Sequence, residues 1–271
     1  MTLKILHVSD IHIRKLKYHT EYREVFAQLY EKAAAEKPDI ILNTGDTFHT
    51  KTDLSSEAVQ MMSELFSNLA DIAPFHMILG NHDMNLRSLG RLDAISPVVD
   101  NLNHPNIHFH KYSDVISLTD DIDMHILSIV DPDNWTKTPN KKKTNIAVYH
   151  GSVKGVKTDM GWAMEHGDID ISELNKYDFA LLGDIHKTNQ MVNSNPRFRY
   201  PGSLVQQNHG ETNDKGFIVW EIENKDSYGV RHCVLENPKP FVTIILTKTG
   251  RLPKNAKVKD GARLRLVSNA N

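Results

Sequence analysis

The sequence predicts an α/β protein built as a two-layer β-sandwich flanked by helices. Two observations support this prediction. The first part of the chain alternates apolar strands with amphipathic helices, whereas after about residue 105 short strands follow one another and helices become scarce. An open sheet with helices on both faces would need a helix between successive strands, so a two-layer sheet explains the later part better. At 271 residues the chain is long enough for one such domain, or for one and part of another.

The start of the chain predicts a strand, a helix and a second strand. Residues 3–8 and residues 39–44 are short apolar runs. Between them, residues 21–36 carry apolar side chains at the i, i+3, i+4, i+7 spacing of an amphipathic helix, and Pro38 closes the segment. This order predicts two parallel strands joined by a right-handed crossover.

The same pattern continues once and then changes. A helical stretch over residues 55–70 leads to an apolar strand at residues 75–79. The later part of the chain predicts a series of short strands with few helices. These strands are expected at residues 107–109, 115–118, 124–130, 146–149 and 179–182.

The end of the chain differs from the rest. Residues 237–241 have the composition of a linker, and two strands are expected after them, at residues 242–247 and 263–267. Two strands alone do not form a stable domain. Either they complete the sheet of the first domain, or the native chain continues past Asn271.

The composition excludes several classes of protein. No run of about 18 apolar residues predicts a membrane span, and the N-terminus lacks a secretory signal, so the cytoplasm is the expected location. Cys233 is alone, which excludes an internal disulfide and a thiolate metal cluster. A net charge of −2 gives no global argument for binding nucleic acid, so any DNA affinity must be local.

Polar clusters follow the predicted strands at the point where each strand ends. Strand ends on one side of a layered α/β fold converge, so these side chains are expected to meet. Oxygen and imidazole ligands suit Mn²⁺, Mg²⁺, Fe²⁺ or Zn²⁺, and two such ions could stabilise charge on both the entering and the leaving oxygen of a phosphodiester. The clusters are Asp10 with His12, Gly45 with Asp46, Asn81 with His82 and Asp83, His150, and Asp184 with His186.

Taken together, the motifs resemble those of a known superfamily. D-x-H, G-D, G-N-H-D, a single H and G-D-x-H occur in the order of the calcineurin-like metallophosphoesterases. A narrower resemblance, to the SbcD and meiotic-recombination-eleven nucleases, rests on HVSDIHI, GDTFH, GNHD and the segment YPGSL at residues 200–204. It spans residues 3 to about 247. YPGSL is the discriminating part, because general phosphoesterases of this class often lack it. The resemblance implies the calcineurin-like metallophosphoesterase fold.

The resemblance also implies a set of metal ligands and catalytic groups. Two divalent ions are expected, Mn²⁺ first and Mg²⁺ as the alternative. His82 would donate a proton or clamp the transition state, Asp83 would orient the His82 ring, and His49 would contact the phosphate side of the site. A solvated loop position is the alternative for His49. The implied ligands are Asp10, His12 and His186 for one ion, Asn81 and His150 for the other, and Asp46 as the bridge between them.

The chain departs from the family pattern at Asp184, where many relatives have a histidine. An aspartate there could bind the second ion through oxygen, which would favour Mn²⁺ or Mg²⁺ over Zn²⁺. This is the expectation that we favour. The alternative is that Asp184 is hydrogen bonded to His150 or to a metal-bound water.

Other polar residues have two interpretations. The lysines at residues 141–143, with Lys154 and Lys157, flank the expected His150 strand and could contact DNA phosphates near the site, or they could be solvated. Arg197, Arg199 and Tyr200 could contact the DNA backbone, and packing under the site is the alternative for Tyr200. Structural or solvent roles are expected for His7, His104, His108, His110 and His232.

The resemblance implies a Mn²⁺-dependent DNA exonuclease or endonuclease, a subunit of a double-strand-break repair or recombination complex. DNA and an ABC-type ATPase of the SbcC kind are the implied partners, a homodimer is compatible with it, and no membrane partner is expected. Residues 1–236 would form the nuclease domain, and residues 237–271 the start of a DNA-capping domain that is cut short. The compact chain would suit a phage-encoded member working in the host cytoplasm.

Two other functions remain open. The alternative within enzymes is a stand-alone metallophosphodiesterase or phosphatase that acts on a non-DNA substrate. The alternative outside enzymes is a scaffold that kept the fold and lost the metals. The complete set of candidate ligands argues against the scaffold.

Overall fold

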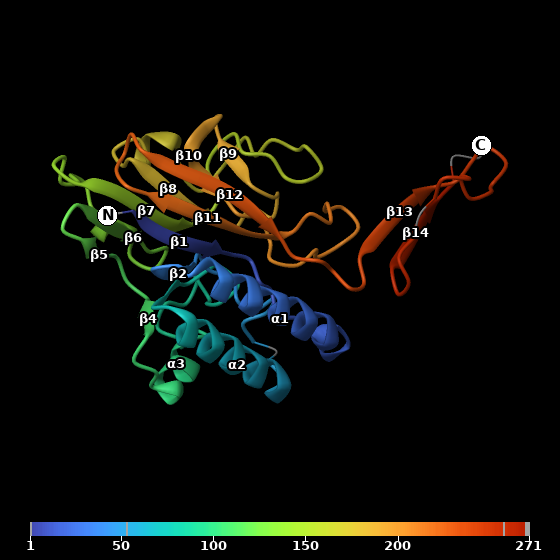
Figure 1. The fold of residues 1–271 in the computed structure, drawn as a ribbon, viewed down its shortest axis with the longest axis horizontal. Helices are drawn as coiled ribbons and strands as arrows, with labels where there is room; N and C mark the ends of the chain where they lie inside the picture. Colours follow the sequence, from blue (N-terminus) through green and yellow to red (C-terminus); the bar gives the residue numbers. More distant parts are fainter. Residues whose placement is uncertain (1, 53, 257, 269–271) are drawn as a thin grey trace.

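The computed structural model of the protein describes residues 2–52, 54–256 and 258–268. In this part of the chain, two six-stranded sheets pack face to face, and a separate two-stranded sheet lies beside them (Figure 1). The predicted two-layer α/β sandwich is therefore confirmed.

The first sheet contains both the start of the chain and two late strands. Its members are β1 (Leu3–Val8), β2 (Ile40–Asn43), β3 (Phe75–Ile78), β4 (Ile107–His110), β11 (Gly216–Ile222) and β12 (Tyr228–Val234). They lie in the order β12-β11-β1-β2-β3-β4. β1 to β4 are parallel, as the predicted crossovers require, whereas β11 and β12 are antiparallel additions at one edge.

The second sheet forms the other layer of the sandwich. Its members are β5 (Asp114–Thr119), β6 (Ile122–Leu127), β7 (Thr144–His150), β8 (Phe179–Gly183), β9 (Gln190–Val192) and β10 (Asn195–Tyr200). Their order is β5-β6-β7-β8-β10-β9, and the central strands β6, β7, β8 and β10 are parallel. The carboxyl ends of parallel strands from both sheets can therefore contribute to one site.

The α-helices pack on the outer face of the first sheet (Figure 1). They are α1 (His19–Glu36), α2 (Ser56–Ile72) and α3 (Ser96–Leu102), with 3-10 turns at Leu16–Tyr18, Pro132–Asn134 and Ile171–Glu173. Both predicted helices are confirmed. α3 was not predicted, because seven residues are too few to show a helical period. No helix in the described residues has the length and apolarity needed to cross a bilayer.

Local signals explain where the two long helices begin and end. The Ser55 hydroxyl accepts a hydrogen bond from the backbone N–H of Ala58 at 3.2 Å and caps the start of α2. Lys37 ends α1 in the left-handed conformation (φ 49°), and Pro38 follows it.

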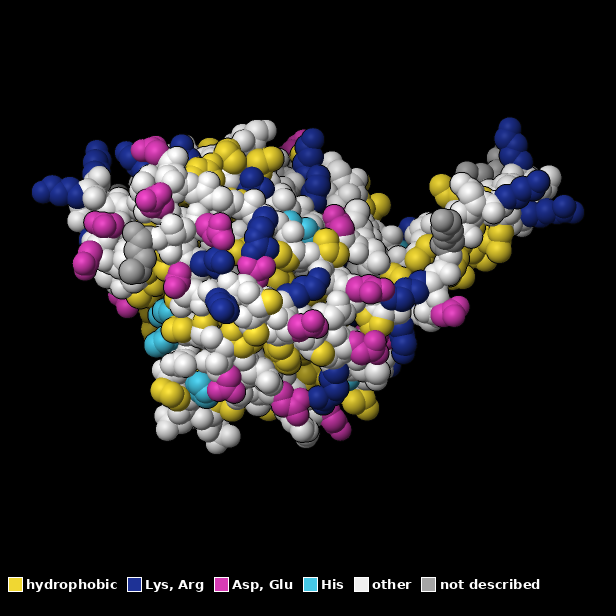
Figure 2. Space-filling view, in the orientation of Figure 1, with side chains coloured by type: hydrophobic (Ala, Val, Ile, Leu, Met, Phe, Trp, Pro, Cys, Tyr) yellow, Lys and Arg dark blue, Asp and Glu magenta, His cyan; other side chains and the backbone are white. Residues whose placement is uncertain are grey.

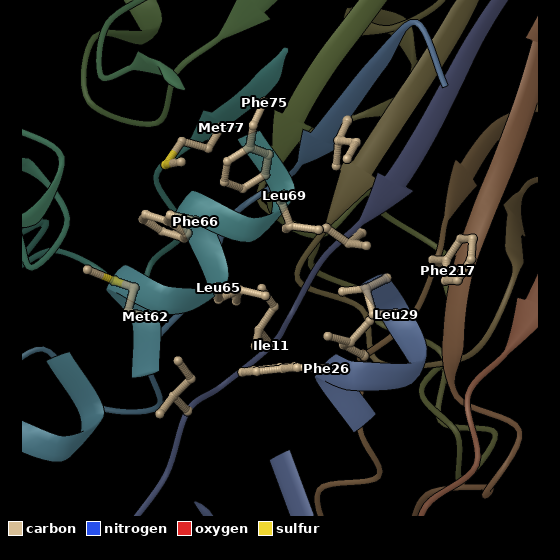
Figure 3. Close-up of a cluster of buried hydrophobic side chains, with 14 of the residues drawn as sticks. Ile11, Phe26, Leu29, Met62, Leu65, Phe66, Leu69, Phe75, Met77 and Phe217 are labelled. Carbon is tan, nitrogen blue, oxygen red and sulfur yellow. The ribbon is translucent and has the colours of Figure 1, made fainter. Parts of the chain in front are cut away.

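Alternate residues of the strands face different cores. In β1, Leu6 and Val8 point toward the helices, whereas Leu3 and Ile5 point between the two sheets. Figure 3 shows the core under the helices, where side chains of α1, α2, β3 and β11 pack together. Its labelled members include Phe26, Leu29, Leu65, Phe66, Leu69, Phe75 and Phe217. Loops cover the outer face of the second sheet.

The last two strands form a unit of their own. β13 (Phe241–Ile245) and β14 (Arg263–Val267) pair in parallel and join neither six-stranded sheet. They project to one side of the sandwich and carry basic and hydrophobic side chains (Figures 1 and 2). Gln206 attaches the unit to the body: its side chain accepts from Phe241 N at 2.8 Å and donates to Phe241 O at 3.0 Å. The predicted role of residues 237–271 in a capping domain stays a prediction.

Histidine side chains gather on the surface beside β4 (Figure 2). His76 of β3 stacks on His108 of β4 with ring centroids 4.6 Å apart, and His76 Nδ1 lies 3.0 Å from His110 Nε2. Burial, followed by repulsion from His110 and His108, lowers the pKa of His76 to about 3. Burial and His108 lower the pKa of His110 to about 4. Both rings are neutral near pH 7.

These shifts predict that acid destabilises the fold. The pKa of His76 is lower in the folded than in the unfolded state, so its contribution is present above about pH 6.5 and is lost as the pH falls toward 3. Between pH 7 and 5, the free energy of unfolding of the wild type should fall by about 1–2 kcal/mol more than that of His76→Leu. Urea denaturation at both pH values, in EDTA, measures the difference. Equal losses in the two proteins would contradict the prediction.

Candidate metal centre and active site

The predicted site residues meet where strands of both sheets end. Asp10 and His12 follow β1, Asp46 follows β2, and residues 81–83 follow β3 in the first sheet. His150 ends β7 of the second sheet, and the segment with Asp184 and His186 follows β8. The site thus lies at the seam between the two layers, where parallel strands of both sheets point to the same edge.

The side chains form two groups that share Asp46. In the first group, His12 Nε2 lies 3.0 Å from His186 Nε2, and each of these nitrogens lies 3.9 Å from Asp10 Oδ1. The second group contains His150. Asp46 Oδ2 lies 3.5 Å from His12 Nε2 of the first group, whereas Asp46 Oδ1 lies 3.4 Å from His150 Nε2 of the second. Each carboxylate oxygen of Asp46 faces a different histidine, which is the arrangement that a bridging ligand requires.

Asp184 and Asn81 lie beside the second group. Asp184 Oδ1 lies 3.8 Å from His150 Nε2 and accepts a hydrogen bond from Asn81 Nδ2 at 3.0 Å. This bond leaves the carbonyl oxygen of Asn81 available as a ligand. The carboxylate of Asp184 therefore faces the site, in a position compatible with either role expected for it.

The residues present fit divalent ions. His150 Nδ1 donates to the carbonyl oxygen of Thr44 at 2.7 Å, so the lone pair of the ring is on Nε2. That nitrogen is buried and has no hydrogen-bond partner in the described part of the chain. The ligand atoms of Asp10, Asp46 and His150 all lie within 4.8 Å of one another, as do those of Asp10, His12 and His186. This donor set of oxygen and imidazole suits Mn²⁺, Mg²⁺, Fe²⁺ or Zn²⁺.

The electrostatics of the site favour a cation. Burial raises the pKa of Asp10 to about 6, although His186 and His150 oppose the rise. Burial alone would lower the pKa of His150, but the Asp46 and Asp10 carboxylates hold it well above its usual value. These buried carboxylates attract positive charge, which a divalent ion supplies more strongly than a protonated imidazole.

The loops that carry the ligands are strained. Asp10, His12, Asp46 and Asp184 all adopt the left-handed conformation, with φ of 51°, 49°, 56° and 98°. Such a conformation costs of order 1–3 kcal/mol for a residue other than glycine and persists where the surroundings enforce it. Here the enforcement includes backbone bonds between adjacent loops, from Asp10 N to Gly45 O at 3.1 Å and from His12 N to Asp46 O at 3.0 Å.

Two glycines allow the loops to approach closely. A Cβ on Gly80 would lie 2.0 Å from Asp46 Oδ1, and one on Gly45 (φ +100°) would lie 2.6 Å from His150 Nδ1. A side chain at either position would displace a candidate ligand. The glycines of the G-D and G-N-H-D motifs therefore make room for the metal centre.

The expected role of Asp83 is wrong. Its carboxylate is fully buried and accepts from the backbone N–H groups of Asp46 at 2.9 Å, Gly80 at 3.0 Å and Phe48 at 3.1 Å. It does not orient the ring of His82. The buried position turns Asp83 toward the backbone of two loops, so it braces the loop that presents Asp46.

His82 is oriented by a main-chain group instead. Its Nδ1 donates to the carbonyl oxygen of His49 at 2.7 Å, and its backbone N–H donates to Asp46 Oδ1 at 2.8 Å. His82 and the exposed His49 line a cavity of about 420 Å³, together with His12 and Arg14. The structure thus brings His82 and His49 to the site, and their roles stay predictions. Nitrogens of His12, His49 and His82 lie within 4.8 Å of one another, so His82 could also bind a metal.

The sequence interpretation missed Glu211, Lys215 and Arg14. Glu211 Oε1 accepts from His186 Nδ1 at 2.8 Å, and the buried Lys215 Nζ lies 3.4 Å from Glu211 Oε2. Arg14 reaches the cavity and donates to Gln207 Oε1 at 2.5 Å. A signal for Glu211 and Lys215 existed, because residues 206–215 form a polar run that begins two positions after the YPGSL segment.

The YPGSL segment acts as a scaffold under the site. The buried Tyr200 hydroxyl donates to Gly151 O at 2.9 Å and accepts from Val153 N at 3.0 Å, so the packing interpretation of Tyr200 is correct. The Ser203 hydroxyl donates to Glu211 Oε2 at 3.0 Å. Leu204 N donates to Asp10 O at 3.3 Å. The segment thus supports the loops that carry ligands of both groups.

The interpretation of residues 141–143 as DNA contacts near the site is wrong. These lysines precede β7, whereas His150 is its last residue. At about 3.3 Å per residue the strand separates them by about 20 Å. Lys143 Nζ instead binds Asp123 Oδ1 at 2.8 Å. Lys154 and Lys157 come after the carboxyl end of β7, the end that carries His150. Their contact with DNA stays a prediction.

The chain matches the family described as "Calcineurin-like phosphoesterase" over residues 3–188. It therefore belongs to this family of metal-dependent phosphoester hydrolases, and membership implies two divalent metal ions. The crystal structure of a dimetal phosphatase from Danio rerio has the same fold, with a TM-score of 0.52 at 10% identity over 87% of this chain and 99% of that chain.

The curated relatives are longer proteins. "Uncharacterized protein R555" of Acanthamoeba polyphaga mimivirus is 38% identical over 237 residues, which cover 82% of this chain and 18% of that protein. "DNA double-strand break repair protein Mre11" of Saccharolobus solfataricus is 28% identical over 203 residues, 68% of this chain and 49% of that protein. The protein of the same name from Sulfurisphaera tokodaii is 26% identical over 203 residues, which are also 68% of this chain and 49% of that protein. The chain spans half or less of the length of these relatives.

Replacing Asp184 by His should change the metal preference. An oxygen ligand beside His150 and Asn81 favours Mn²⁺ or Mg²⁺, and an imidazole in its place should favour Zn²⁺. Activity of Asp184→His across a metal series, compared with wild type and with Asp184→Asn, measures the shift. An unchanged metal profile would mean that Asp184 acts only through hydrogen bonds.

Replacing Glu211 by Gln should weaken metal binding. The Glu211 carboxylate accepts from His186 Nδ1 and fixes which nitrogen faces the site, and partners of this kind change metal affinity by about 10–100-fold. Calorimetric titration with Mn²⁺ measures the loss. Glu236→Gln, which breaks a surface ion pair with Lys259, is the matched control and should keep wild-type affinity. Equal Mn²⁺ affinities in the wild type, Glu211→Gln and Glu236→Gln would mean that Glu211 stabilises its loop without affecting metal binding.

Proposed function

We propose that this chain is a DNA nuclease of the SbcD and meiotic-recombination-eleven type, acting in double-strand-break repair or recombination. The observation that carries the proposal is the bridging geometry of Asp46, whose two oxygens face His12 at 3.5 Å and His150 at 3.4 Å. The similarity to archaeal proteins named for DNA double-strand break repair supports DNA as the substrate.

The residues suggest how a phosphodiester would be cleaved. Two divalent ions, Mn²⁺ in this proposal, would supply positive charge for the entering and leaving oxygens. The Asp46 carboxylate and the two groups of histidines would hold these ions at the seam of the sandwich. His82 presents Nε2 to the cavity, because its Nδ1 donates to His49 O, and in its doubly protonated form it can give the Nε2 proton to the leaving oxygen. Arg14 lines the same cavity and can bind a phosphate oxygen.

Partners follow from the same proposal. DNA is the substrate, and an ABC-type ATPase of the SbcC kind is the proposed partner. A homodimer is compatible with this assembly.

One observation favours a second candidate, a stand-alone metallophosphodiesterase or phosphatase that acts on a non-DNA substrate. A cavity of about 610 Å³ opens beside Asn81 and His150, and four carboxylates line it. They belong to Asp133, Asp168, Asp170 and Glu173. This acidic wall would repel a continuous phosphate backbone, so a long DNA chain would have to leave the site in another direction.

His82→Ala should abolish most DNA cleavage and leave metal binding intact. We expect a loss of about 10²–10⁴ in rate, the usual contribution of a positioned acid. The assay follows linear DNA, bis-p-nitrophenyl phosphate and a phosphopeptide in Mn²⁺, Mg²⁺ and Zn²⁺, with and without the candidate ATPase. Metal titration by calorimetry accompanies it.

The outcomes separate the proposals. Cleavage of the phosphopeptide or the small ester without cleavage of DNA would favour the second candidate. Loss of ions in His82→Ala would make His82 a ligand. His104→Ala is the matched control, since His104 pairs with Asp71 on the surface at 3.2 Å and should keep wild-type rates.

A further inference from the structure

A second cavity opens beside the metal centre and shares no lining residue with the acidic one. It has a volume of about 550 Å³ and reaches Asp184 and His186. These two residues also line the cavity of about 420 Å³ beside His82 and Arg14, which we call the central cavity. Met160, Trp162 and Met164 form an apolar wall in it. A group attached to a phosphate in the central cavity could therefore enter this space directly. We call it the Trp162 pocket.

Trp162 and Met160 are unusually exposed for large apolar side chains. Trp162 is 76% exposed and Met160 is 72% exposed. Single exposed apolar residues are common on protein surfaces, but these two share the wall of one cavity beside a candidate active site. Exposed aromatic side chains next to a site for phosphodiesters are the usual platform for stacking bases.

The segment that carries these side chains is ordered by its own backbone. Thr158 N donates to Trp162 O at 2.9 Å, and Gly161 N donates to Thr158 O at 2.9 Å, which closes a tight turn. Met164 N donates to Val156 O at 2.8 Å below it. The turn therefore presents Met160 and Trp162 in a defined position, so that little entropy is lost when a ligand stacks on them.

The charges of this wall suit an anionic substrate better than those of the acidic cavity. Asp159, Asp184 and Glu211 line the Trp162 pocket, and buried Lys215 pairs with Asp159 at 3.1 Å and with Glu211 at 3.4 Å, so one of the three negative charges is offset. The hydroxyl of Thr212 also donates to Asp159 at 3.2 Å. The Trp162 pocket is thus less negatively charged than the acidic cavity, and an uncharged group linked to the phosphate can enter it.

We propose that the Trp162 pocket binds an unpaired nucleobase next to the scissile phosphate, by stacking on Trp162 with Met160 at its edge. The proposal rests on the proposed function, since it takes DNA as the substrate, and it adds a preference. A base inside a duplex is already stacked between its neighbours, so a single-stranded segment or a frayed end places a base in the pocket without the cost of unstacking it from a duplex.

The test compares two single-stranded oligonucleotides of equal length in Mn²⁺, one normal and one with stable abasic residues around the cleavage position. Trp162→Ala should raise KM for the normal strand by about 5–100-fold, to the value for the abasic strand, because stacking on the ring is lost. The kcat for both strands should not change in Trp162→Ala, and neither should the KM for the abasic strand. Trp162→Phe should recover most of the affinity.

Tyr112→Ala is the matched control, because Tyr112 is 58% exposed and lines neither the Trp162 pocket nor the central cavity. It should behave as wild type. An equal rise in KM for both strands in Trp162→Ala, or no rise for either, would overturn the stacking proposal while the nuclease function stands. Hydrolysis of bis-p-nitrophenyl phosphate by the wild type without cleavage of either strand would instead remove the nuclease function, and the stacking proposal with it.

Discussion

The carboxylate of Asp83 joins the two loops on which the metal centre depends. It is fully buried and accepts three backbone N–H bonds, from Asp46, Phe48 and Gly80. Burial, with repulsion from Asp46, raises its pKa to about 7 against the pull of these donors. Hydrogen bonds to a buried carboxylate are strong and directional, so this one group sets the position of the loop after β2 relative to the loop after β3. The place of Asp46 between the two histidine groups follows from that position.

Three histidine rings of the site, two of them candidate ligands, are oriented by a bond to the nitrogen that does not face the site. His150 donates to Thr44 O at 2.7 Å, and His186 Nδ1 bonds to Glu211 at 2.8 Å. His82 donates to His49 O at 2.7 Å. Such partners choose the tautomer and the direction of each ring before any ion binds. The cost of this preorganisation is visible in the left-handed backbone of Asp10, His12, Asp46 and Asp184.

The sandwich architecture gives the site its asymmetry. Ligands come from both sheets, so the centre lies in the seam, and one cavity reaches it at Asn81 and His150 and another at Asp184 and His186. One is lined by carboxylates such as Asp168 and Asp170, whereas in the other Lys215 offsets part of the negative charge and Trp162 is exposed. A substrate with two different substituents on its phosphate would meet two different environments, which is a physical basis for choosing its orientation.

The sequence by itself determined the sandwich, the long helices and the candidate ligands, because these depend on local period and on polar residues placed where strands end. Only the tertiary structure decided the partners of those residues. Asp83 follows His82 directly, yet it binds the backbone of another loop, and Glu211 is 25 positions from the histidine that it orients. Lys143 is close to His150 in sequence, but the extended strand between them carries it to the opposite edge of the sheet. Contacts between segments distant in the chain have no local signature, so packing alone could assign them.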